Sequence, residues 1–390
     1  MKMSDLASLG YNREVFQPEH EAFREVVRRF FQQEVEPNYR RWEKDGFFPA
    51  ALFKTAAEYG ILCSGIPEEY GGGGGDLLHQ VILHEEHGFS ASGASLEAGL
   101  CTELASYVLL DGGTEEQKKE WLPFFASGKG IAEVGLSEPG AGSDARAIKT
   151  FARRDGDDYV INGSKMWMSN GPLISVLFVV AKTETEGNSE AISMFIVPFE
   201  ETKGITVSKP TPLMTKGCGG VSEIFFDGVR IPARNLVGGV EGRGLHCAMG
   251  SIATARIATA ARCVAACELA MALTIDYTKE RKAFGQRVFE FQNTQFKLAS
   301  VRADIAAGRA LIDSYLKKLN KNQLGADESA IAKLWASELE ARVMDECLQL
   351  HGGMGYSDEM PISKMYSFAR VHRIFLGTSE IMRSTIARSL

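Results

Sequence analysis

The sequence predicts a mostly α-helical protein with a β-rich domain in the middle, and the spacing of its apolar residues supports this in each part of the chain. Residues 1–129 and 241–390 carry apolar side chains at helical intervals with charged residues between them. Residues 130–240 instead contain about seven short β-rich runs separated by Gly, Pro and Asn. We therefore expect three domains with these boundaries.

The N-terminal domain is expected to consist of helices interrupted by one loop. Phe23, Val27 and Phe30 recur at the spacing of a helix face that packs against a core. Residues 71–75 are five consecutive glycines, which cannot hold a helix because each loses much backbone entropy on folding. Helical spacing resumes after this loop.

The middle domain is expected to be a small antiparallel sheet. Residues 158–163 read as a strand that ends in an Asn-Gly hairpin turn. After residue 244 the pattern is helical again, and the long alanine-rich segments 245–281 and 291–319 favour an antiparallel bundle. Such a bundle can also offer a face for oligomerisation.

Composition excludes several classes of protein. A net charge of −7 argues against nucleic-acid binding, which needs clustered Lys and Arg. No apolar run approaches the roughly 20 residues of a membrane span, and the first residues lack the pattern of a signal or transit peptide. The seven cysteines are scattered without CxxC spacing, so we expect no metal site. Together these features predict a cytoplasmic protein without membrane insertion.

Two segments of the β-rich domain suggest contact with a planar ring. The turn at residues 135–144 is rich in Gly and Ser, so backbone can approach a ligand closely and donate hydrogen bonds. Trp167 and Ser169 are two residues apart on an expected strand, which puts an indole and a hydroxyl on the same side. The alternatives are an ordinary turn and a core tryptophan beside a strand serine.

Two segments of the helical bundle suggest contact with phosphate. Residues 281–285 place cations at the end of a long helix, where they can bind phosphate or simply offset the helix dipole. Residues 349–356 contain three glycines that let backbone come near a ligand. Neither segment is decisive alone.

Taken together, in this order and at these distances, the four segments resemble the acyl-CoA dehydrogenase family. Residues 66–72 (IPEEYGG) and 226–232 (FDGVRIP) are also similar to that family. The resemblance extends from about Phe23 to Arg388. It implies a helical N-terminal domain, a β-barrel middle domain and a C-terminal four-helix bundle, assembled as a homotetramer that is a dimer of dimers.

The resemblance also implies FAD as the cofactor and an acyl-CoA as the substrate. FAD would lie between the β-barrel and the bundle, with a neighbouring subunit completing the pyrophosphate and adenine site. An electron-transfer flavoprotein is the expected electron acceptor. The residues matched to FAD-binding positions of the family are Leu136, Ser137, Gly142, Ser143, Trp167, Ser169, Arg281, Phe284, Gln292, Gln349, Gly352, Gly353, Thr378 and Glu380.

One departure from the family concerns the catalytic base. Family members use a glutamate to remove the α-proton of the thioester, either just before the Gly-Thr pair or just before a bundle arginine. Leu376 and Ala255 occupy those two positions here, and Arg256 is the matching arginine. Leucine cannot accept a proton, although the backbone N–H of Leu376 keeps its expected hydrogen bond to the thioester carbonyl.

Another acid is therefore needed if the chain performs this reaction. Glu97 aligns with the segment that lines the acyl pocket, and the alternative for it is a solvated or ion-paired glutamate at a helix end. Glu103 is a weaker candidate, and four further residues are expected to be structural: Glu85, Glu86, His87 and His372.

Three functions remain open on the sequence. The first is an acyl-CoA dehydrogenase or reductase with a relocated base. The second is an FAD-binding subunit of a heteromer whose partner chain supplies the acid. The third is a flavin-dependent oxygenase on the same scaffold. Arg256, the Trp167–Ser169 pair and the Gly/Ser turn favour a thioester site over the oxygenase.

Overall fold

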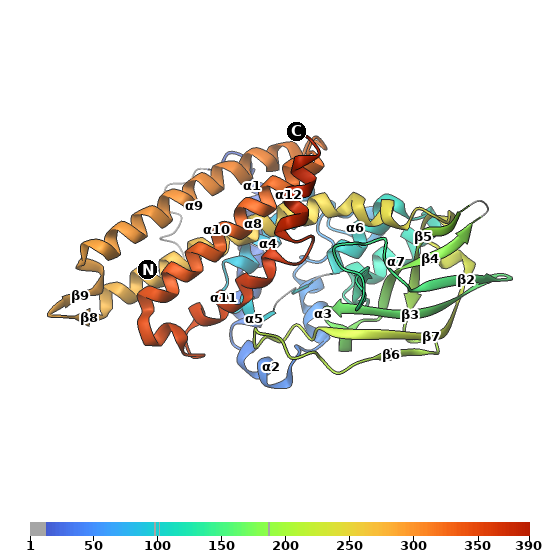
Figure 1. Ribbon diagram of the computed structural model, residues 1–390, viewed down its shortest axis with the longest axis horizontal. Helices are drawn as coiled ribbons and strands as arrows, with labels where there is room; N and C mark the ends of the chain where they lie inside the picture. Colours follow the sequence, from blue (N-terminus) through green and yellow to red (C-terminus); the bar gives the residue numbers. More distant parts are fainter. Residues whose placement is uncertain (1–12, 97–98, 101, 186–187) are drawn as a thin grey trace.

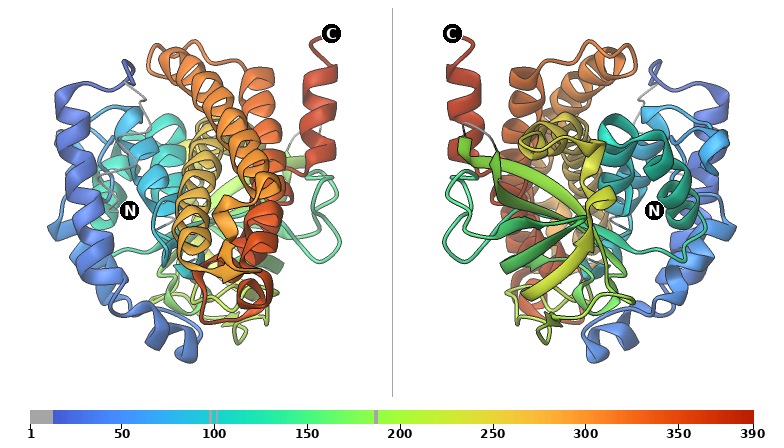
Figure 2. Two further views of the ribbon diagram at one scale, coloured as in Figure 1. Left: turned by 90° about the vertical axis from the view of Figure 1, so that its left-hand side faces the viewer. Right: turned by 90° about the vertical axis from the view of Figure 1, so that its right-hand side faces the viewer.

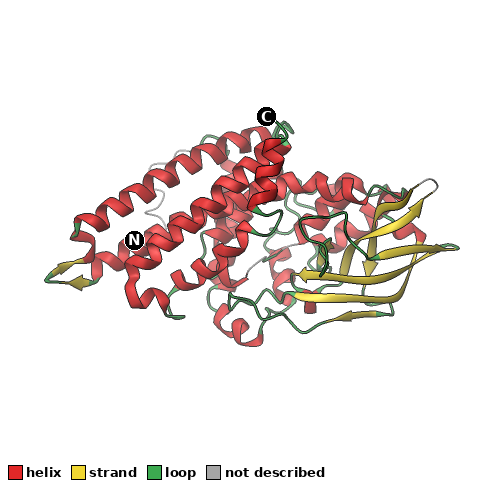
Figure 3. Cartoon of the chain, in the orientation of Figure 1, coloured by secondary structure: helices red, strands yellow, loops and turns green. Residues whose placement is uncertain are grey.

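The computed structural model describes residues 13–96, 99–100, 102–185 and 188–390, and Figure 1 shows their arrangement. The C-terminal helical bundle lies at one end of an elongated molecule and the β-sheet at the other, and the last helices of the N-terminal region lie beside the sheet (Figures 1 and 3). The predicted order of helices, β-rich domain and helical bundle is confirmed. The exact domain boundaries stay a prediction.

The N-terminal region is helical, with the glycine run as a loop. Gly72 packs so tightly in this loop that a Cβ there would lie 2.2 Å from the carbonyl oxygen of Ile66. The helices of this region are α1 (Pro18–Phe30), which continues as the π-turn η3 (Phe31–Val35), α2 (Tyr39–Asp45), α3 (Ala51–Glu58), α4 (Leu77–Gly88), α5 (Gly93–Leu96), α6 (Thr102–Gly112) and α7 (Glu115–Ala126).

The middle region is a seven-stranded sheet with the order β1-β4-β2-β3-β7-β6, and β5 pairs with β4. Figure 2 shows its strands fanning out beside the helices. Its strands are β1 (Ala132–Gly135), β2 (Phe151–Asp155), β3 (Asp158–Met168), β4 (Val176–Thr185), β5 (Asn188–Pro198), β6 (Ile205–Val207) and β7 (Ser222–Pro232).

Two sequence predictions about this sheet are wrong. The sheet is mixed rather than antiparallel, because β1 and β2 each pair in parallel with β4. The Asn-Gly pair is no hairpin turn, because β3 runs through it and the turn falls at residues 156–157. Gly163 instead sits at a bulge with φ 142°, where a Cβ would lie 2.5 Å from Thr150 Oγ1. Close packing against Thr150 therefore explains this glycine.

The C-terminal region is a bundle of long helices. α8 (Gly244–Glu280) leads through a short hairpin, β8 (Lys282–Ala283) and β9 (Gln286–Arg287), into α9 (Gln292–Leu319) and α10 (Ala326–His351). The chain ends in α11 (Pro361–Ala369) and α12 (Ser379–Ala387). Figure 2 shows α8 between the N-terminal helices and the remaining helices of the bundle.

α8 is the central helix of the molecule. Among the described residues it is the one helix that is long and apolar enough to cross a membrane, and 94% of its most apolar stretch is buried inside the protein. Its apolar side chains join the largest core, which also includes α1, α4, α9 and α10. Its apolar character is therefore explained by burial in this core.

A buried ion-pair cluster fixes the N-terminal helices to the bundle. Glu85 on α4 is 2% exposed and accepts hydrogen bonds from Arg13, Arg24 on α1 and Arg309 on α9 at 2.7–2.8 Å. Glu86 pairs with Arg24 and with Arg28. The prediction that these two glutamates are structural agrees with these contacts.

Candidate active site

A buried ion pair holds the Gly/Ser turn against the sheet. Lys165 on β3 is fully buried, and its Nζ donates to the carbonyl oxygen of Leu136 at 3.2 Å and to Glu138 Oε1 at 2.6 Å. Glu138 also accepts from the backbone N–H groups of Lys149 and Thr150 at 2.6 and 3.0 Å. The backbone N–H of Met166 donates to the carbonyl oxygen of Ser137 at 2.9 Å. The turn is therefore preorganised.

The two charges of this pair depend on each other. Burial lowers the pKa of Lys165 to about 8, although Glu138 offsets part of this effect. Burial alone would raise the pKa of Glu138, but hydrogen bonds from Lys165 and Thr150 outweigh it and the pKa lies below its ordinary value. Both groups are charged at neutral pH, so removal of either one leaves a buried charge without its partner.

We expect the Lys165→Met substitution to lower the free energy of unfolding by about 3 kcal/mol and to weaken retention of FAD, because it leaves Glu138 buried and unpaired. Thermal denaturation and the flavin content after gel filtration measure both effects. Lys149→Met is the matched control, since Lys149 is exposed in the same loop and its backbone hydrogen bond is kept. Unchanged flavin content in Lys165→Met would contradict this role.

Trp167 and Ser169 lie on either side of Met168, the last residue of β3. They are therefore not two residues of one regular strand, as the sequence predicted. β3 ends at Met168, with a register shift between Lys165 and Met168. Trp167 has a left-handed backbone with φ 66°, and its side chain is 53% exposed. Ser169 lies in the following turn and is half-buried. The strand-alternation argument is therefore wrong, and the indole owes its exposure to the bulge.

The residues around this indole suit a planar, hydrogen-bonding ligand. Leu136 and Ser137 are half-buried, and Ser143 is exposed. A Cβ at Gly142 would meet no atom within 4 Å, so the turn borders open space. An exposed indole beside several hydroxyls and backbone amides fits one face and one polar edge of an isoalloxazine ring.

The expected phosphate-binding residues lie elsewhere. The hairpin β8–β9 stands at the end of the bundle opposite the sheet (Figure 1). Phe284 in its turn has φ 51° and is 98% exposed. Arg281, Gln292, Gln349, Gly352 and Gly353 are exposed as well. One chain does not bring these residues to the Gly/Ser turn, so any shared site needs a second chain.

Two buried cations hold the loop at Leu376. Arg256 on α8 donates from Nε to the carbonyl oxygen of Leu376 at 3.2 Å. Lys333 on α10, which is fully buried, donates from Nζ to the carbonyl oxygen of Gly377 at 2.7 Å. Leu376 has φ 53° and Gly377 φ 95°. For leucine this conformation costs about 1–2 kcal/mol, so the two hydrogen bonds help to stabilise a strained backbone.

The same loop exposes a backbone donor. Among the hydrogen bonds of the described residues, none has the N–H of Leu376 as its donor. Burial lowers the pKa of Arg256 below its ordinary value and that of Lys333 to about 8, so both side chains keep their charge at neutral pH. The N–H of Leu376 is therefore a donor that could stabilise an oxyanion, in a loop whose carbonyl oxygens are held by two charged side chains.

Thr378 and Glu380 follow this loop at the start of α12. Thr378 is the N-cap residue, and its Oγ1 accepts a hydrogen bond from the N–H of Ile381 at 3.3 Å. Glu380 is exposed and lies 3.8 Å from Arg383. Both side chains stand at the surface of the bundle near Leu376, where a bound cofactor could reach them.

The candidate acids differ in how the structure places them. Glu97 lies outside the described residues. Its neighbours are held in place: the carbonyl oxygen of Ser95 accepts from the N–H of Cys218 at 2.7 Å, and that of Gly99 accepts from Asn170 Nδ2 at 3.1 Å. Asn170 follows Trp167 and Ser169 in the sequence. Gly99 therefore lies beside the turn that follows Trp167.

Glu103 is buried on α6 and makes a structural contact. It is 2% exposed, and its Oε1 accepts from the N–H of Cys63 at 2.6 Å. Burial raises the pKa of Glu103 from 4.5 to about 7, and the hydrogen bond from Cys63 offsets only part of that rise. Two small cavities in the helical core are lined in part by His87, and Glu103 lines neither of them.

This raised pKa makes stability depend on pH. A folded-state pKa above the unfolded value means that the stability contributed by the protonated acid is present at low pH and is lost as pH rises from about 4.5 to about 7. Glu103→Gln keeps the acceptor for Cys63, so we expect it to stabilise the protein by about 2–3 kcal/mol at pH 8 and hardly at all near pH 4.5. Thermal denaturation across this range measures the effect; Glu120→Gln, at an exposed site, should leave the profile unchanged. A parallel profile for Glu103→Gln and the wild type would contradict this role.

An exposed indole near a Gly/Ser turn, and a loop whose Leu376 N–H has no acceptor among the described residues, are features that fit one class of protein, a flavin-dependent oxidoreductase. The sequence matches the acyl-CoA dehydrogenase family over three segments, the N-terminal domain at residues 17–129, the middle domain at 134–229 and the C-terminal domain at 242–390. The chain belongs to the acyl-CoA dehydrogenase family.

Individual relatives agree over nearly the full length. The chain is 40% identical to the long-chain specific acyl-CoA dehydrogenase of mouse mitochondria, over 99% of this chain and 89% of the relative. Its fold matches the crystal structure of an acyl-CoA dehydrogenase from Geobacillus kaustophilus with a TM-score of 0.92 and 35% identity, over 97% of this chain and 99% of that one. A Bacillus anthracis acyl-CoA dehydrogenase solved with FAD matches with a TM-score of 0.88 and 28% identity, over 98% of this chain and 68% of that one.

These findings confirm four of the sequence predictions: the family, the fold, FAD as the cofactor and enzymatic activity as an acyl-CoA oxidoreductase. The roles assigned to individual residues stay predictions. Sequence reasoning missed the buried lysines Lys165 and Lys333, and the buried Arg262, which contacts His87. A lysine within a strand and an arginine within an alanine-rich helix were signals that could have found Lys165 and Arg262.

Proposed function

We propose that the chain oxidises the Cα–Cβ bond of an acyl-CoA whose thioester carbonyl is held at Leu376. We further propose that a carboxylate at a position other than 376 acts as the base that removes the α-proton. The supporting observation is the loop at Leu376, which Arg256 and Lys333 hold in a left-handed conformation with the N–H of Leu376 left without an acceptor among the described residues. A preorganised donor of this kind stabilises the developing enolate oxygen and so makes the α-proton more acidic.

FAD supplies the hydride acceptor of this reaction when it is bound. The residues that would hold its ring are Leu136, Ser137, Ser143, Trp167 and Ser169, with Thr378 and Glu380 at the edge of the loop. Gly142 leaves room for close approach of the ligand to backbone. Arg281, Phe284, Gln292, Gln349, Gly352 and Gly353 would hold the pyrophosphate and adenine of the FAD bound by a neighbouring copy.

We assign removal of the α-proton to Glu97. Glu97 lies between Ser95 and Gly99 in the sequence; the carbonyl oxygen of Ser95 is bound by Cys218 in the loop before β7, and that of Gly99 by Asn170 in the turn after Trp167. Of the candidates, Glu103, Glu85 and Glu86 are engaged by their own hydrogen-bond partners in the helical core.

Assembly and electron acceptor are part of the same proposal. Phe284, Phe296 and Tyr356 are large apolar side chains that are more than half exposed on the bundle, a pattern typical of a surface that another chain covers. We expect a homotetramer in the cytoplasm that passes electrons to an electron-transfer flavoprotein. A heteromer with a glutamate-bearing partner is the alternative, and mass determination of the purified assembly distinguishes the two.

The base assignment is tested with the Glu97→Gln variant of the FAD-loaded protein. We expect loss of α-proton exchange with solvent deuterium and a fall in flavin reduction by acyl-CoA of about 10²–10⁴-fold, with acyl-CoA affinity nearly unchanged. Glu103→Gln is the control and should keep its rate. Full activity of Glu97→Gln would remove Glu97 from the reaction.

A further inference from the structure

The end of β3 and the turn after it (residues 167–170, the tryptophan turn) carry a buried asparagine. Asn170 follows Trp167 by three residues, is 1% exposed and has a left-handed backbone with φ 55° and ψ 24°. Asparagine tolerates this conformation better than most residues with a Cβ. Trp167 is also left-handed, with φ 66°. The tryptophan turn therefore holds two residues in a backbone region that persists only with tertiary support.

The backbone of Asn170 joins the tryptophan turn to the loop before β7. Its N–H donates to the carbonyl oxygen of Gly219 at 2.7 Å, and the N–H of Gly171 donates to that of Gly220 at 2.9 Å. The same loop reaches the N-terminal region, because the N–H of Cys218 donates to the carbonyl oxygen of Ser95 at 2.7 Å. These bonds use backbone atoms, so they do not depend on the side chain at position 170.

The side chain of Asn170 adds a direct connection to the N-terminal region. Its Nδ2 donates to the carbonyl oxygen of Gly99, which lies between α5 and α6, at 3.1 Å. The tryptophan turn is thereby linked to this part of the chain twice: through the loop before β7 to Ser95, and through the amide of Asn170 to Gly99. The second link is the one that a substitution at position 170 can remove by itself.

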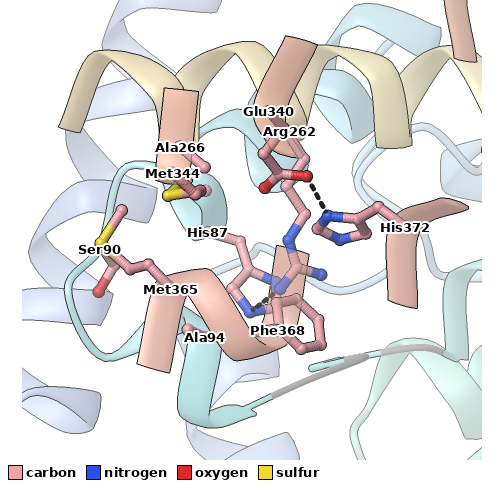
Figure 4. A pocket seen from close by; sticks show the side chains of 11 residues that line it. His87, Ser90, Ala94, Arg262, Ala266, Glu340, Met344, Met365, Phe368 and His372 are labelled. Carbon is pink, nitrogen blue, oxygen red and sulfur yellow. Dashed lines mark hydrogen bonds and ion pairs between the residues drawn. The ribbon is translucent and has the colours of Figure 1, made fainter. Parts of the chain in front are cut away.

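Gly99 receives this bond while it packs against a second, fixed neighbour. It is buried with φ 68°, and a Cβ at this position would lie 2.6 Å from His87 Cε1. The His87 ring stacks on Phe31 with their centroids 5.5 Å apart, and its Nε2 lies 3.1 Å from Arg262 Nη2 (Figure 4). Gly99 therefore contacts the amide of Asn170 and a ring that is itself held in place.

We propose that Asn170 is a positioning residue for flavin reduction: its side-chain amide fixes the tryptophan turn relative to the chain at Gly99. This inference rests on the proposed function, since Glu97, the proposed base, precedes Gly99 by two residues in the sequence. The α-proton and the β-hydride leave neighbouring carbons of one substrate, so the flavin and the base must keep a fixed relative position. A displacement of about 1 Å in such a site costs up to about 100-fold in rate.

A purely structural role for this amide predicts a different result. Loss of the bond between Asn170 and Gly99 would then lower thermal stability and leave the rate of flavin reduction unchanged in the folded, FAD-loaded protein. The backbone bonds of the turn are kept in either case. Removal of one neutral side-chain hydrogen bond should therefore shift the midpoint of thermal unfolding by only a few degrees.

Two variants remove the donor in different ways. Asn170→Gly keeps access to the left-handed backbone. Asn170→Asp keeps the size of the side chain but replaces Nδ2 by an oxygen, which cannot donate when the carboxyl group is ionised. Asn322→Gly is the matched control, because Asn322 is also left-handed, with φ 54°, but is exposed in the turn after α9.

The variants are compared with the wild type as FAD-loaded proteins. Anaerobic stopped-flow absorbance at saturating acyl-CoA gives the rate constant of flavin reduction, and its concentration dependence gives the affinity. The probes are butyryl-CoA, isobutyryl-CoA, octanoyl-CoA, palmitoyl-CoA and glutaryl-CoA. We expect both Asn170 variants to be reduced about 10–100-fold more slowly than the wild type, with affinity for acyl-CoA within about twofold.

A second readout needs no substrate. The visible circular dichroism of the oxidised flavin reports the surroundings of the ring, so we expect it to change in both Asn170 variants. Asn322→Gly should match the wild type in rate, affinity and flavin spectrum. If one Asn170 variant does not fold, the other decides the question.

The outcomes separate the two proposals. Wild-type rate constants and an unchanged flavin spectrum in the Asn170 variants would overturn the positioning role and leave the proposed function intact. A wild type whose flavin none of these thioesters reduces would instead contradict the proposed function. The flavin spectrum of the variants would then still decide whether Asn170 positions the tryptophan turn.

Discussion

Leu376→Glu, made in a chain that already carries Glu97→Gln, is expected to restore flavin reduction by acyl-CoA by about 10²–10³-fold. Arg256 and Lys333 bind the backbone of this loop rather than a side chain at position 376. The loop can therefore accept a new side chain while its carbonyl groups stay in place. A carboxylate at this position would stand beside the donor that holds the thioester, within reach of the α-proton.

Anaerobic stopped-flow absorbance of the oxidised flavin measures this rate. Leu376→Gln in the same background is the matched control, because it has nearly the same shape but no carboxylate, and it should stay inactive. The interpretation fails if Leu376→Glu binds both FAD and acyl-CoA yet remains as slow as the control, since residue 376 would then not face the reacting carbon.

The second large effect concerns stability. Glu85→Gln is expected to lower the free energy of unfolding by about 3–5 kcal/mol at pH 7, because Arg13, Arg24 and Arg309 would lose their shared carboxylate inside the protein. Thermal and urea denaturation of the FAD-loaded protein measure the loss. Glu25→Gln removes an exposed partner of Arg28 and should change stability by less than about 1 kcal/mol.

The same pair of variants gives a pH dependence with a definite sign. Burial alone would raise the pKa of Glu85, but the three arginines outweigh it and hold the pKa well below its ordinary value. A depressed pKa means that the stabilisation is present above the unfolded-state value near 4.5 and is lost as pH falls below it. The difference between wild type and Glu85→Gln should therefore shrink in acid, and a difference that grows in acid would contradict this assignment.

Periodicity alone was sufficient to predict the order of the domains. Apolar spacing predicts the long helices and the glycine run predicts their interruption, because both depend on residues close in sequence. The parallel pairing of β1 and β2 with β4 depends on contacts between residues about 30 to 45 positions apart, which no local pattern encodes. The Asn-Gly pair gave a wrong prediction of a hairpin turn for the same reason. Its glycine is required by close packing against Thr150, which lies just before β2 in the sequence.

The sequence predicted which segments carry the candidate site, but it did not predict the buried charged residues that hold these segments in place. The resemblance to the family located the Gly/Ser turn, Trp167 and the loop at Leu376. Lys165, Lys333 and Arg262 are charged residues in apolar segments, and only the fold brings each one to a partner: Glu138, the carbonyl oxygen of Gly377 and His87, respectively. Their role depends on tertiary contacts, so it could not be predicted from spacing.

The central claim is acyl-CoA oxidation by a flavin site that has no acid at position 376. Its most direct test is anaerobic mixing of the purified FAD-loaded protein with a panel of monocarboxylic and dicarboxylic acyl-CoA thioesters, with Leu376→Ala in parallel. We predict that at least one thioester bleaches the oxidised-flavin absorbance in both proteins, because the side chain at 376 takes no part in proton removal. A flavin that no thioester in the panel reduces would contradict the claim.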